Sequence, residues 1–172
     1  MTSGKSTIGP ILANVLGWEF YDLDDELVKQ TGMEIVDIFQ IKGEEYFRKI
    51  ENERLTELSI LDNAIISLGG GTIANSNNFE IIKNSGSLIY LKATPEALYN
   101  RLKSKIDRPL FRDLVLGEAN KADFIERIRE RLKEREQYYE ASDYIFDTTN
   151  AHIGDTVDKI ARTINRNLDE KS

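Results

Sequence analysis

Residues 64–72 read AIISLGGGT, an apolar run that leads directly into three consecutive glycines. Almost every residue of the run is apolar, which favours a β-strand covered by helices on both faces. Similar short runs recur at 18–21, 87–91 and 144–146. Each is followed by a helical pattern, and strands that alternate with helices indicate a parallel sheet. The sequence therefore predicts an α/β fold with three layers, α/β/α, around a parallel sheet.

The segments between these runs carry the apolar spacing of helices. The predicted helices lie at about 5–16, 24–30, 34–42, 44–60, 77–84, 95–104, 121–140 and 153–167. Two stretches interrupt the alternation: about 24–60, which is more helix than a crossover needs, and about 105–121, where periodicity is lost. We interpret the first as a helical insert and the second as a mobile flap, called the lid below, within one domain, 1–172.

Composition excludes several classes of protein. The chain has 172 residues, which fits one domain, and no cysteine, which excludes a disulfide scaffold and a zinc–thiolate site. Its net charge of −7 argues against nucleic acid as a partner. No apolar run approaches the length of a membrane span and no secretory signal is visible, so we expect a cytoplasmic protein. We also expect a monomer.

The sequence Gly4-Lys5-Ser6-Thr7 opens the first predicted helix. It matches the second half of a phosphate-binding loop, in which backbone N–H groups cradle phosphates, lysine reaches the β/γ-phosphates and a hydroxyl holds Mg²⁺. The alternative is an ordinary helix start capped by a serine. Position favours phosphate binding, because the string opens a helix and the next strand ends in carboxylates.

The first glycine of that loop and the strand that feeds it would precede Met1. We expect the gene to encode, upstream and in frame, an apolar strand followed by glycine. Without that strand, we expect a gap in the sheet and weak ATP binding.

Asp22 and Asp24 follow the first predicted strand, at the carboxyl end of the sheet where α/β proteins bind ligands. If the strand continues, both face the same way. One would support Mg²⁺ and the other would accept a proton from a substrate hydroxyl. Asp24 could equally cap the next helix, and both interpretations remain open.

Gly69, Gly70 and Gly71 follow the buried strand at once. They would permit positive φ and a close approach of a ligand to the backbone. A tight turn is the alternative, but a turn rarely needs three glycines, so we favour a binding site.

Arginines supply the remaining candidates. Arg48 and Glu51 are spaced i,i+3 on a predicted helix, which by itself favours a surface ion pair over a clamp for a substrate carboxylate. Arg108 opens the predicted lid. Arg135 lies on a highly charged helix whose charges are mostly a solvated face, and nothing in its neighbours distinguishes it.

In this order, the motifs resemble the shikimate kinase family, a group of small-molecule kinases with a phosphate-binding loop. The matching pieces are Gly4-Lys5-Ser6-Thr7, Asp22-Leu23-Asp24, Phe47-Arg48-Lys49-Ile50-Glu51, Gly69-Gly70-Gly71, Arg108-Pro109-Leu110 and Arg135. The resemblance covers about 1–150. It implies a fold like that of nucleoside monophosphate kinases, with a parallel five-stranded sheet, and ATP-dependent phosphorylation of the shikimate 3-hydroxyl in aromatic amino-acid biosynthesis.

The resemblance also implies roles, residue by residue. Gly4, Lys5, Ser6 and Thr7 would bind ATP, with Arg108 covering the nucleotide and Lys5 acting on the transferred group. Ser6 and Asp22 would hold Mg²⁺. Asp24 would bind shikimate and act as the base; Arg48 and Arg135 would clamp the shikimate carboxylate beside Gly69, Gly70 and Gly71.

Two alternatives remain. One is another kinase of the same fold, similar to gluconate kinase, against which the pair Arg48 and Arg135 argues. The other is a truncated, catalytically silent protein that binds a ligand or partner, supported only by the absent first strand.

Overall fold

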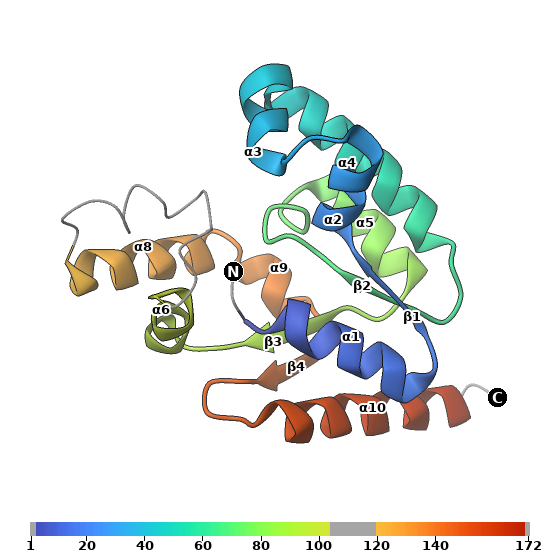
Figure 1. Cartoon of the computed structure of the whole chain (residues 1–172). Coiled ribbons are helices and arrows are strands. Elements are labelled where there is room, and N and C mark those ends of the chain that lie inside the picture. The colour runs from blue at the N-terminus through green and yellow to red at the C-terminus, as the bar shows by residue number, and fades with distance from the viewer. Residues whose placement is uncertain (1–2, 104–119, 171–172) are drawn as a thin grey trace.

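The computed structural model describes residues 3–103 and 120–170. Within them the strands form two parallel pairs, as Figure 1 shows. β1 (Glu19–Asp22) pairs with β2 (Ala64–Ser67), and β3 (Ile89–Lys92) pairs with β4 (Tyr144–Asp147). All four predicted strands are confirmed, with ends that differ by one or two residues. Among the described residues, β2 and β3 are not hydrogen-bonded to each other.

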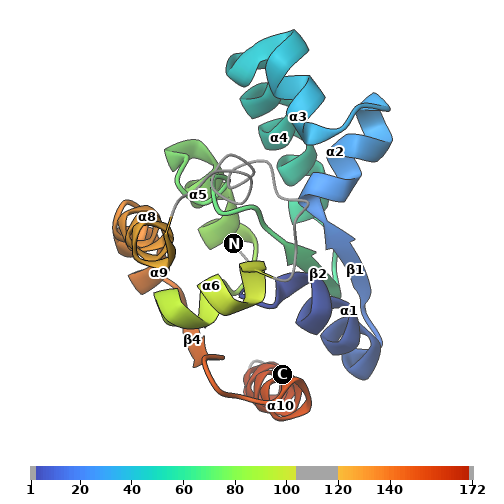
Figure 2. The same cartoon turned by 60° about the vertical axis from the view of Figure 1, so that its left-hand side comes forward.

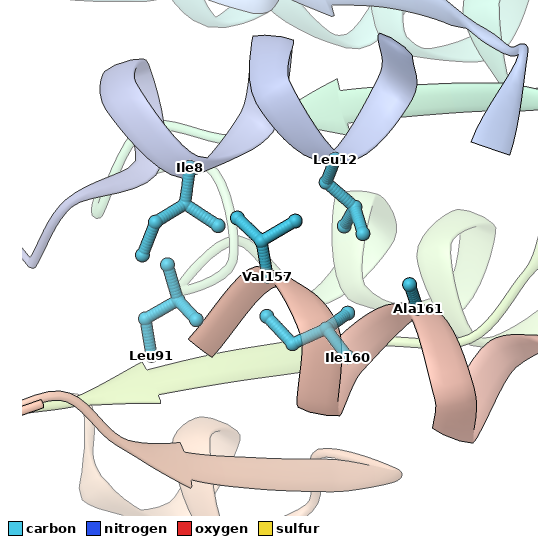
Figure 3. Close-up of a cluster of buried hydrophobic side chains, with 6 residues drawn as sticks. All are labelled: Ile8, Leu12, Leu91, Val157, Ile160 and Ala161. Atoms are coloured by element: carbon cyan, nitrogen blue, oxygen red, sulfur yellow. The ribbon is translucent and has the colours of Figure 1, made fainter. Parts of the chain in front are cut away.

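Helices α1 (Lys5–Leu16) and α10 (Ile153–Asp169) lie side by side along the sheet pairs. Their contact is apolar, and it also joins β3 to the core (Figure 3). The buried side chains of this cluster are Ile8, Leu12, Leu91, Val157, Ile160 and Ala161. A Cβ atom on Gly9 would overlap the ring of Phe20, so α1 also packs directly on β1. Burial of apolar side chains at about 1.5–3 kcal/mol each therefore fixes the start of α1 relative to both strand pairs.

A helical lobe follows β1 and corresponds to the predicted insert at about 24–60 (upper part of Figure 1). It consists of α2 (Leu23–Thr31), α3 (Ile35–Asp37), the π-helix η1 (Ile38–Lys42) and α4 (Gly43–Ser59). Its own core contains Leu27, Ile38, Phe47 and Ile50.

Helices α5 (Ser76–Ser85), α6 (Pro95–Lys103), α8 (Lys121–Lys133) and α9 (Glu136–Glu140) complete the described fold. In Figure 2, α8 and α9 lie together on the side opposite the helical lobe. The prediction of a single helix at 121–140 is wrong, because the helix is interrupted at Arg135, between α8 and α9. Phe124 and Ile128 of α8 bury against Leu98 and Leu102 of α6. This packing positions α8, which ends two residues before Arg135.

None of the helices that the structure describes has the length and hydropathy needed to cross a membrane. Most of the predicted lid at about 105–121 lies outside the described residues. Arg108 also lies outside them.

Candidate active site

The backbone at the start of α1 has the geometry of an anion-binding helix end. Gly4 has a φ of 112°, a value that favours glycine, and its carbonyl accepts the N–H groups of Thr7 and Ile8. Lys5, Ser6 and Thr7 open the helix as predicted, and Ser6 and Thr7 are exposed. No side chain caps this helix, so the alternative of a capping serine is wrong. The first turn is exposed at Ser6 and Thr7, and a helix N-terminus of this kind favours an anion.

Arg101 of α6 anchors the residue that leads into this turn. Its Nη1 donates to the carbonyl of Ser3 at 3.3 Å and to the hydroxyl of Thr148 at 3.3 Å, and Nη2 donates to the Thr148 carbonyl. Thr148 itself donates to the Ser3 carbonyl at 3.3 Å. The sequence analysis missed Arg101, because nothing around it in the chain distinguishes it from other exposed arginines on helices.

Asp22 and Asp24 occupy different elements. Strand β1 ends at Asp22 and α2 begins at Leu23, so the expectation of a continuing strand is wrong. The helix cap is Asp22 and not Asp24: Oδ1 of Asp22 accepts the N–H of Asp24 at 3.1 Å. Asp24 lies in the first turn of α2, and no described hydrogen bond engages its carboxylate, which leaves this carboxylate for the site.

The environment of Asp24 disfavours its ionised form. Burial raises the pKa of Asp24 above its ordinary value of 3.8, and the charges of Asp22 and Glu51 raise it further. The charge of Lys5 acts in the opposite sense and lowers the pKa. The ammonium group of Lys5, the first residue of α1, and the carboxylate of Asp24 therefore interact electrostatically, as they would in a shared site.

The three glycines after β2 lie against three other predicted site residues. A Cβ atom added at Gly69 would lie 3.3 Å from Oδ1 of Asp24. A Cβ atom added at Gly70 would overlap Nη1 of Arg135, and one added at Gly71 would lie 3.2 Å from Nη2 of Arg48. None of the three has a positive φ, so that part of our expectation is wrong. Glycine is needed here for close approach, because each side chain packs directly on the loop.

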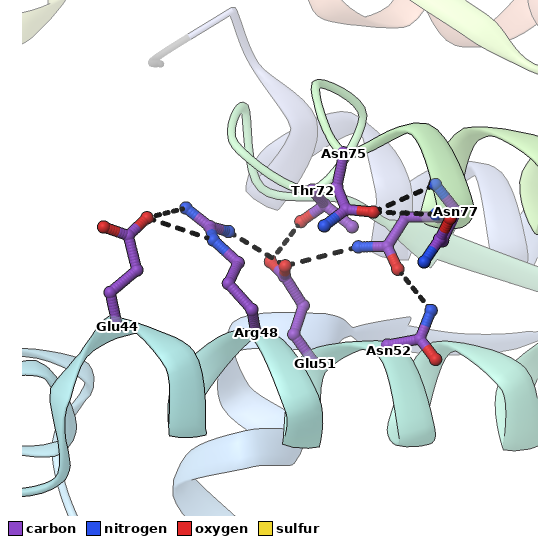
Figure 4. Close-up of polar contacts among 8 residues, drawn as sticks. Glu44, Arg48, Glu51, Asn52, Thr72, Asn75 and Asn77 are labelled. Atoms are coloured by element: carbon purple, nitrogen blue, oxygen red, sulfur yellow. Dashed lines mark hydrogen bonds and ion pairs between the residues drawn. The ribbon is translucent and has the colours of Figure 1, made fainter.

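Arg48 is held by two carboxylates of its own helix, α4 (Figure 4). Its Nη1 donates to Oε2 of Glu51 at 2.9 Å, and its Nε and Nη2 donate to Oε1 of Glu44 at 3.3 Å. The ion pair with Glu51 is therefore present, but Glu51 is only 2% exposed, so this is not a plain surface pair. The pair and the packing against Gly71 together aim Arg48 at the glycine loop.

Glu51 connects Arg48 to the segment that follows the glycines (Figure 4). Its Oε1 accepts the hydroxyl of Thr72 at 2.7 Å, and its Oε2 accepts the amide of Asn78 at 3.3 Å. The side chain of Asn78 also accepts the amide of Asn52 at 2.7 Å. The sequence analysis quoted Glu51 and Thr72 within motifs but assigned neither to the site. A buried polar network of this kind gives Arg48 one orientation.

The break between α8 and α9 directs Arg135 at Gly70. Arg135 is the residue that precedes α9, and its carbonyl accepts the N–H groups of Tyr138 and Tyr139. The ring of Tyr139 stacks on Tyr90 of β3 with centroids 4.4 Å apart. Burial raises the pKa of Tyr90 to about 12, aided by Tyr139 and Glu136, so the phenol of Tyr90 stays neutral near neutral pH. The sequence analysis also missed Tyr139.

Among the described residues there is no ready-made cluster of three metal-ligating side chains. One predicted ligand, Asp22, uses Oδ1 for its cap and keeps Oδ2. This donor chemistry fits Mg²⁺, which usually takes one or two protein oxygens, with water and substrate phosphates completing its shell.

Comparison with known proteins decides between the kinase families. The family model described as "Shikimate kinase" matches residues 1–165. The chain belongs to the shikimate kinase family. A shikimate kinase of Chloroherpeton thalassium is 40% identical over 167 residues, which are 97% of this chain and 89% of that protein. A shikimate kinase of Chlorobaculum parvum is 42% identical over 166 residues, 96% of this chain and 89% of that protein.

Solved shikimate kinases share the fold. The enzyme of Acinetobacter baumannii, solved in complex with shikimate, superposes with a TM-score of 0.83 at 33% identity and covers 96% of this chain and 88% of that one. The enzyme of Bacteroides thetaiotaomicron superposes with a TM-score of 0.81 at 26% identity, over 96% of this chain and 94% of that one. The predicted fold class and family are therefore confirmed: this is an enzyme of the ATP-dependent shikimate phosphorylation step in aromatic amino-acid biosynthesis.

Proposed function

We propose that the described site transfers the γ-phosphoryl group of Mg·ATP to the 3-hydroxyl of shikimate, and that its residues act as follows. The observation that carries the assignment is the glycine loop after β2, where one carboxylate and two guanidinium groups pack on three successive glycines. Asp24 can accept a hydrogen bond from a hydroxyl group, and the two guanidinium groups can bind a carboxylate. Shikimate, a ring acid with hydroxyl groups, offers both.

Arg48 and Arg135 bind the shikimate carboxylate. They come from opposite sides of the loop, since Arg48 belongs to α4 and Arg135 to the break between α8 and α9. Guanidinium groups recognise a carboxylate by paired N–H···O bonds, and a carboxylate held at two sides fixes the ring's orientation. Gly70 and Gly71 allow this approach because a side chain at either position would push the guanidinium away.

Asp24 accepts the proton of the reacting hydroxyl. Its raised pKa makes it a stronger base than an ordinary carboxylate. As the hydroxyl oxygen forms its bond to the γ-phosphorus, the bond from that phosphorus to the β-bridging oxygen breaks and ADP leaves. Lys5 neutralises the charge of the transferred group, and it lies within electrostatic reach of Asp24.

The start of α1, Gly4 to Thr7, binds the phosphates of ATP. Ser6 and Asp22 would hold Mg²⁺, which neutralises charge on the β- and γ-phosphates. Arg108 and the lid at about 105–121 would cover the nucleotide and exclude water, the competing acceptor. The helical lobe at about 24–60 would bind shikimate within the single domain, 1–172. We place the reaction in the cytoplasm, in a monomer that binds neither nucleic acid nor membranes.

The assay couples ADP release to a spectrophotometric readout, with shikimate present and absent. We expect release that depends on shikimate. Arg48→Ala should raise the KM for shikimate at least about tenfold, because a charged hydrogen bond is worth about 1.5–3 kcal/mol, and should leave the KM for ATP unchanged. The matched control is Lys49→Ala, since Lys49 is 72% exposed and pairs only weakly with Glu53 at 3.9 Å.

Three results would contradict the proposal. ADP release with gluconate but not with shikimate would assign the acceptor to another kinase of this fold. No release with either acceptor, together with no heat on titration with Mg·ATP, would show a silent binding protein. Equal effects of Arg48→Ala and Lys49→Ala would remove Arg48 from the shikimate site.

A further inference from the structure

Tyr139 of α9 lies at the glycine loop beside Arg135. A Cβ atom added at Gly70 would overlap Nη1 of Arg135 and would lie 3.6 Å from the hydroxyl oxygen of Tyr139. The guanidinium group and the phenol hydroxyl therefore lie on the same side of Gly70, where glycine leaves the space of a side chain open. The proposed mechanism uses the guanidinium group and leaves the hydroxyl unused.

Neither group has a partner in the described part of the chain. Among the described residues, no hydrogen bond or ion pair engages the guanidinium group of Arg135, and no hydrogen bond engages the hydroxyl of Tyr139. Arg48 differs, because the carboxylates of Glu44 and Glu51 already compensate its charge. The Arg135 side of the glycine loop therefore offers an anion a positive charge that no described carboxylate balances, with a neutral hydroxyl next to it.

Packing fixes the ring of Tyr139. The ring stacks on Tyr90 of β3 with an interplanar angle of 4° and centroids 4.4 Å apart. The N–H of Tyr139 donates to the carbonyl of Arg135 at 3.1 Å, and the carbonyl of Tyr139 accepts the N–H of Ser142 at 3.2 Å. A stacked ring whose backbone is bonded on both sides has little freedom left to lose when a ligand binds, which is the condition for preorganised recognition.

The neighbouring Tyr138 points elsewhere, because successive residues of a helix are turned by about 100°. Its ring lies edge-on to Phe79 of α5, with centroids 5.3 Å apart. The atoms nearest to a Cβ at Gly70 include none from Tyr138. Two adjacent tyrosines of α9 therefore differ in one respect that matters to the site: one brings its hydroxyl to the glycine loop and the other does not.

From these features we propose that the Tyr139 hydroxyl is a third donor to the shikimate carboxylate, beside the guanidinium groups of Arg48 and Arg135. This inference rests on the proposed function and deepens it by naming a residue that determines acceptor specificity. A carboxylate has about four acceptor sites, so it can take N–H groups from the arginines and one O–H from a tyrosine at once. An acceptor without a carboxylate leaves the hydroxyl unpaired and is disfavoured.

Calorimetric titration with shikimate, without nucleotide, tests the contact apart from turnover. Tyr139→Phe keeps the stacked ring and removes only the hydroxyl, so we expect the Kd for shikimate to rise at least about tenfold, as for loss of a hydrogen bond to a charged group. In the coupled ADP assay the KM for shikimate should rise in parallel, with kcat and the KM for ATP unchanged. The control is Tyr138→Phe, which removes the neighbouring hydroxyl and should leave all of these constants unchanged.

A neutral analogue tests the chemistry of the contact. In this analogue a hydroxymethyl group replaces the carboxylate of shikimate. Hydrogen bonds to neutral groups are weaker than those to charged groups, so the effect of Tyr139→Phe on the Kd should shrink to about threefold or less. A hydroxyl with a purely structural role would weaken the binding of both ligands by the same factor.

A change of background separates direct contact from positioning. Tyr139→Phe combined with Arg135→Lys should raise the Kd for shikimate several-fold above that of Arg135→Lys alone, because a direct donor acts without the guanidinium group. A hydroxyl that acts only by orienting the guanidinium group would have no further effect there.

Four results would overturn this inference while the wild type binds shikimate. They are an unchanged Kd in Tyr139→Phe, an equal rise in Tyr138→Phe, an equal loss with the neutral analogue, and no further rise in the Arg135→Lys background. Failure of the wild type to bind shikimate, or to release ADP in its presence, would overturn the proposed function itself and this inference with it.

Discussion

The hydroxyl of Thr72 donates a 2.7 Å hydrogen bond to Oε1 of Glu51, and the two side chains are 0% and 2% exposed. The other oxygen of Glu51 accepts from Arg48 at 2.9 Å. The residue directly after the glycine loop therefore fixes the carboxylate that orients a predicted shikimate-binding arginine. The orientation of Arg48 and the packing of α4 on this loop depend on the same buried bond.

Replacing Thr72 with valine keeps the shape of the side chain and removes this donor. Glu51 would then be buried with an unsatisfied oxygen, at a cost of roughly 1–3 kcal/mol in the free energy of unfolding. We expect a several-fold increase in the KM for shikimate and an unchanged KM for ATP, measured by steady-state kinetics beside urea unfolding. Thr72→Ser should restore both quantities. Equal behaviour of the serine and valine variants would show that the hydrogen bond is not the cause.

Gly70→Ala tests the close approach of Arg135. The added Cβ would overlap Nη1 of the guanidinium and displace it from the loop. We expect the KM for shikimate to rise roughly tenfold to a hundredfold, as for loss of a charged hydrogen bond of about 1.5–3 kcal/mol. Gly154→Ala is the control, because a Cβ there meets nothing within 4 Å. Wild-type kinetics in Gly70→Ala would place Arg135 outside the shikimate site.

The strands and the glycine loop could be predicted because their signals are local. Strands covered on both faces are apolar at almost every position, as 64–68 is, and the residues that follow them gather at one edge of the sheet. The order of motifs was therefore enough to identify the family.

Arg135 and Glu51 could not be assigned from local pattern alone, because tertiary contacts determine what they do. The stretch around Arg135 has an unbroken helical pattern, yet α8 ends at Lys133, α9 begins at Glu136, and the guanidinium of Arg135 packs on Gly70. Glu51 has the spacing of a surface ion pair, but its partners Thr72 and Asn78 are 21 and 27 residues away. No periodicity reports contacts at that separation.

Arg101→Ala tests the anchor of the phosphate-binding end. The variant removes the hydrogen bonds from Arg101 to Ser3 and Thr148, so the segment that leads into Gly4 keeps only the bond from the Thr148 hydroxyl to the Ser3 carbonyl. We expect the KM for ATP to rise about tenfold, the order expected when positioning is lost, with the KM for shikimate unchanged. Arg129→Ala, which removes only exposed pairs with Glu96 and Glu126, is the control. A change in the KM for shikimate alone would contradict this role.

Asp24→Asn should separate activity from stability. In the folded protein, burial and the charges of Asp22 and Glu51 raise the pKa of Asp24 above 3.8, although Lys5 opposes them. Ionisation of Asp24 therefore costs folding free energy: the cost is complete above the raised pKa and vanishes below 3.8, where both states are protonated. Asparagine removes this cost and also removes the proposed base.

At about pH 7 the Asn variant should be more stable than wild type by roughly 0.5–2 kcal/mol, a common range for single stabilising substitutions. The gain in urea unfolding should shrink as the pH falls towards about 4, because wild-type Asp24 then becomes protonated in the folded state. Turnover should fall by about 10²–10⁴, the usual contribution of general base catalysis. Asp25→Asn, at the exposed neighbouring position, should leave turnover unchanged. A variant that loses stability at about pH 7 would contradict the sign of this linkage, and one with wild-type turnover would remove Asp24 from the mechanism.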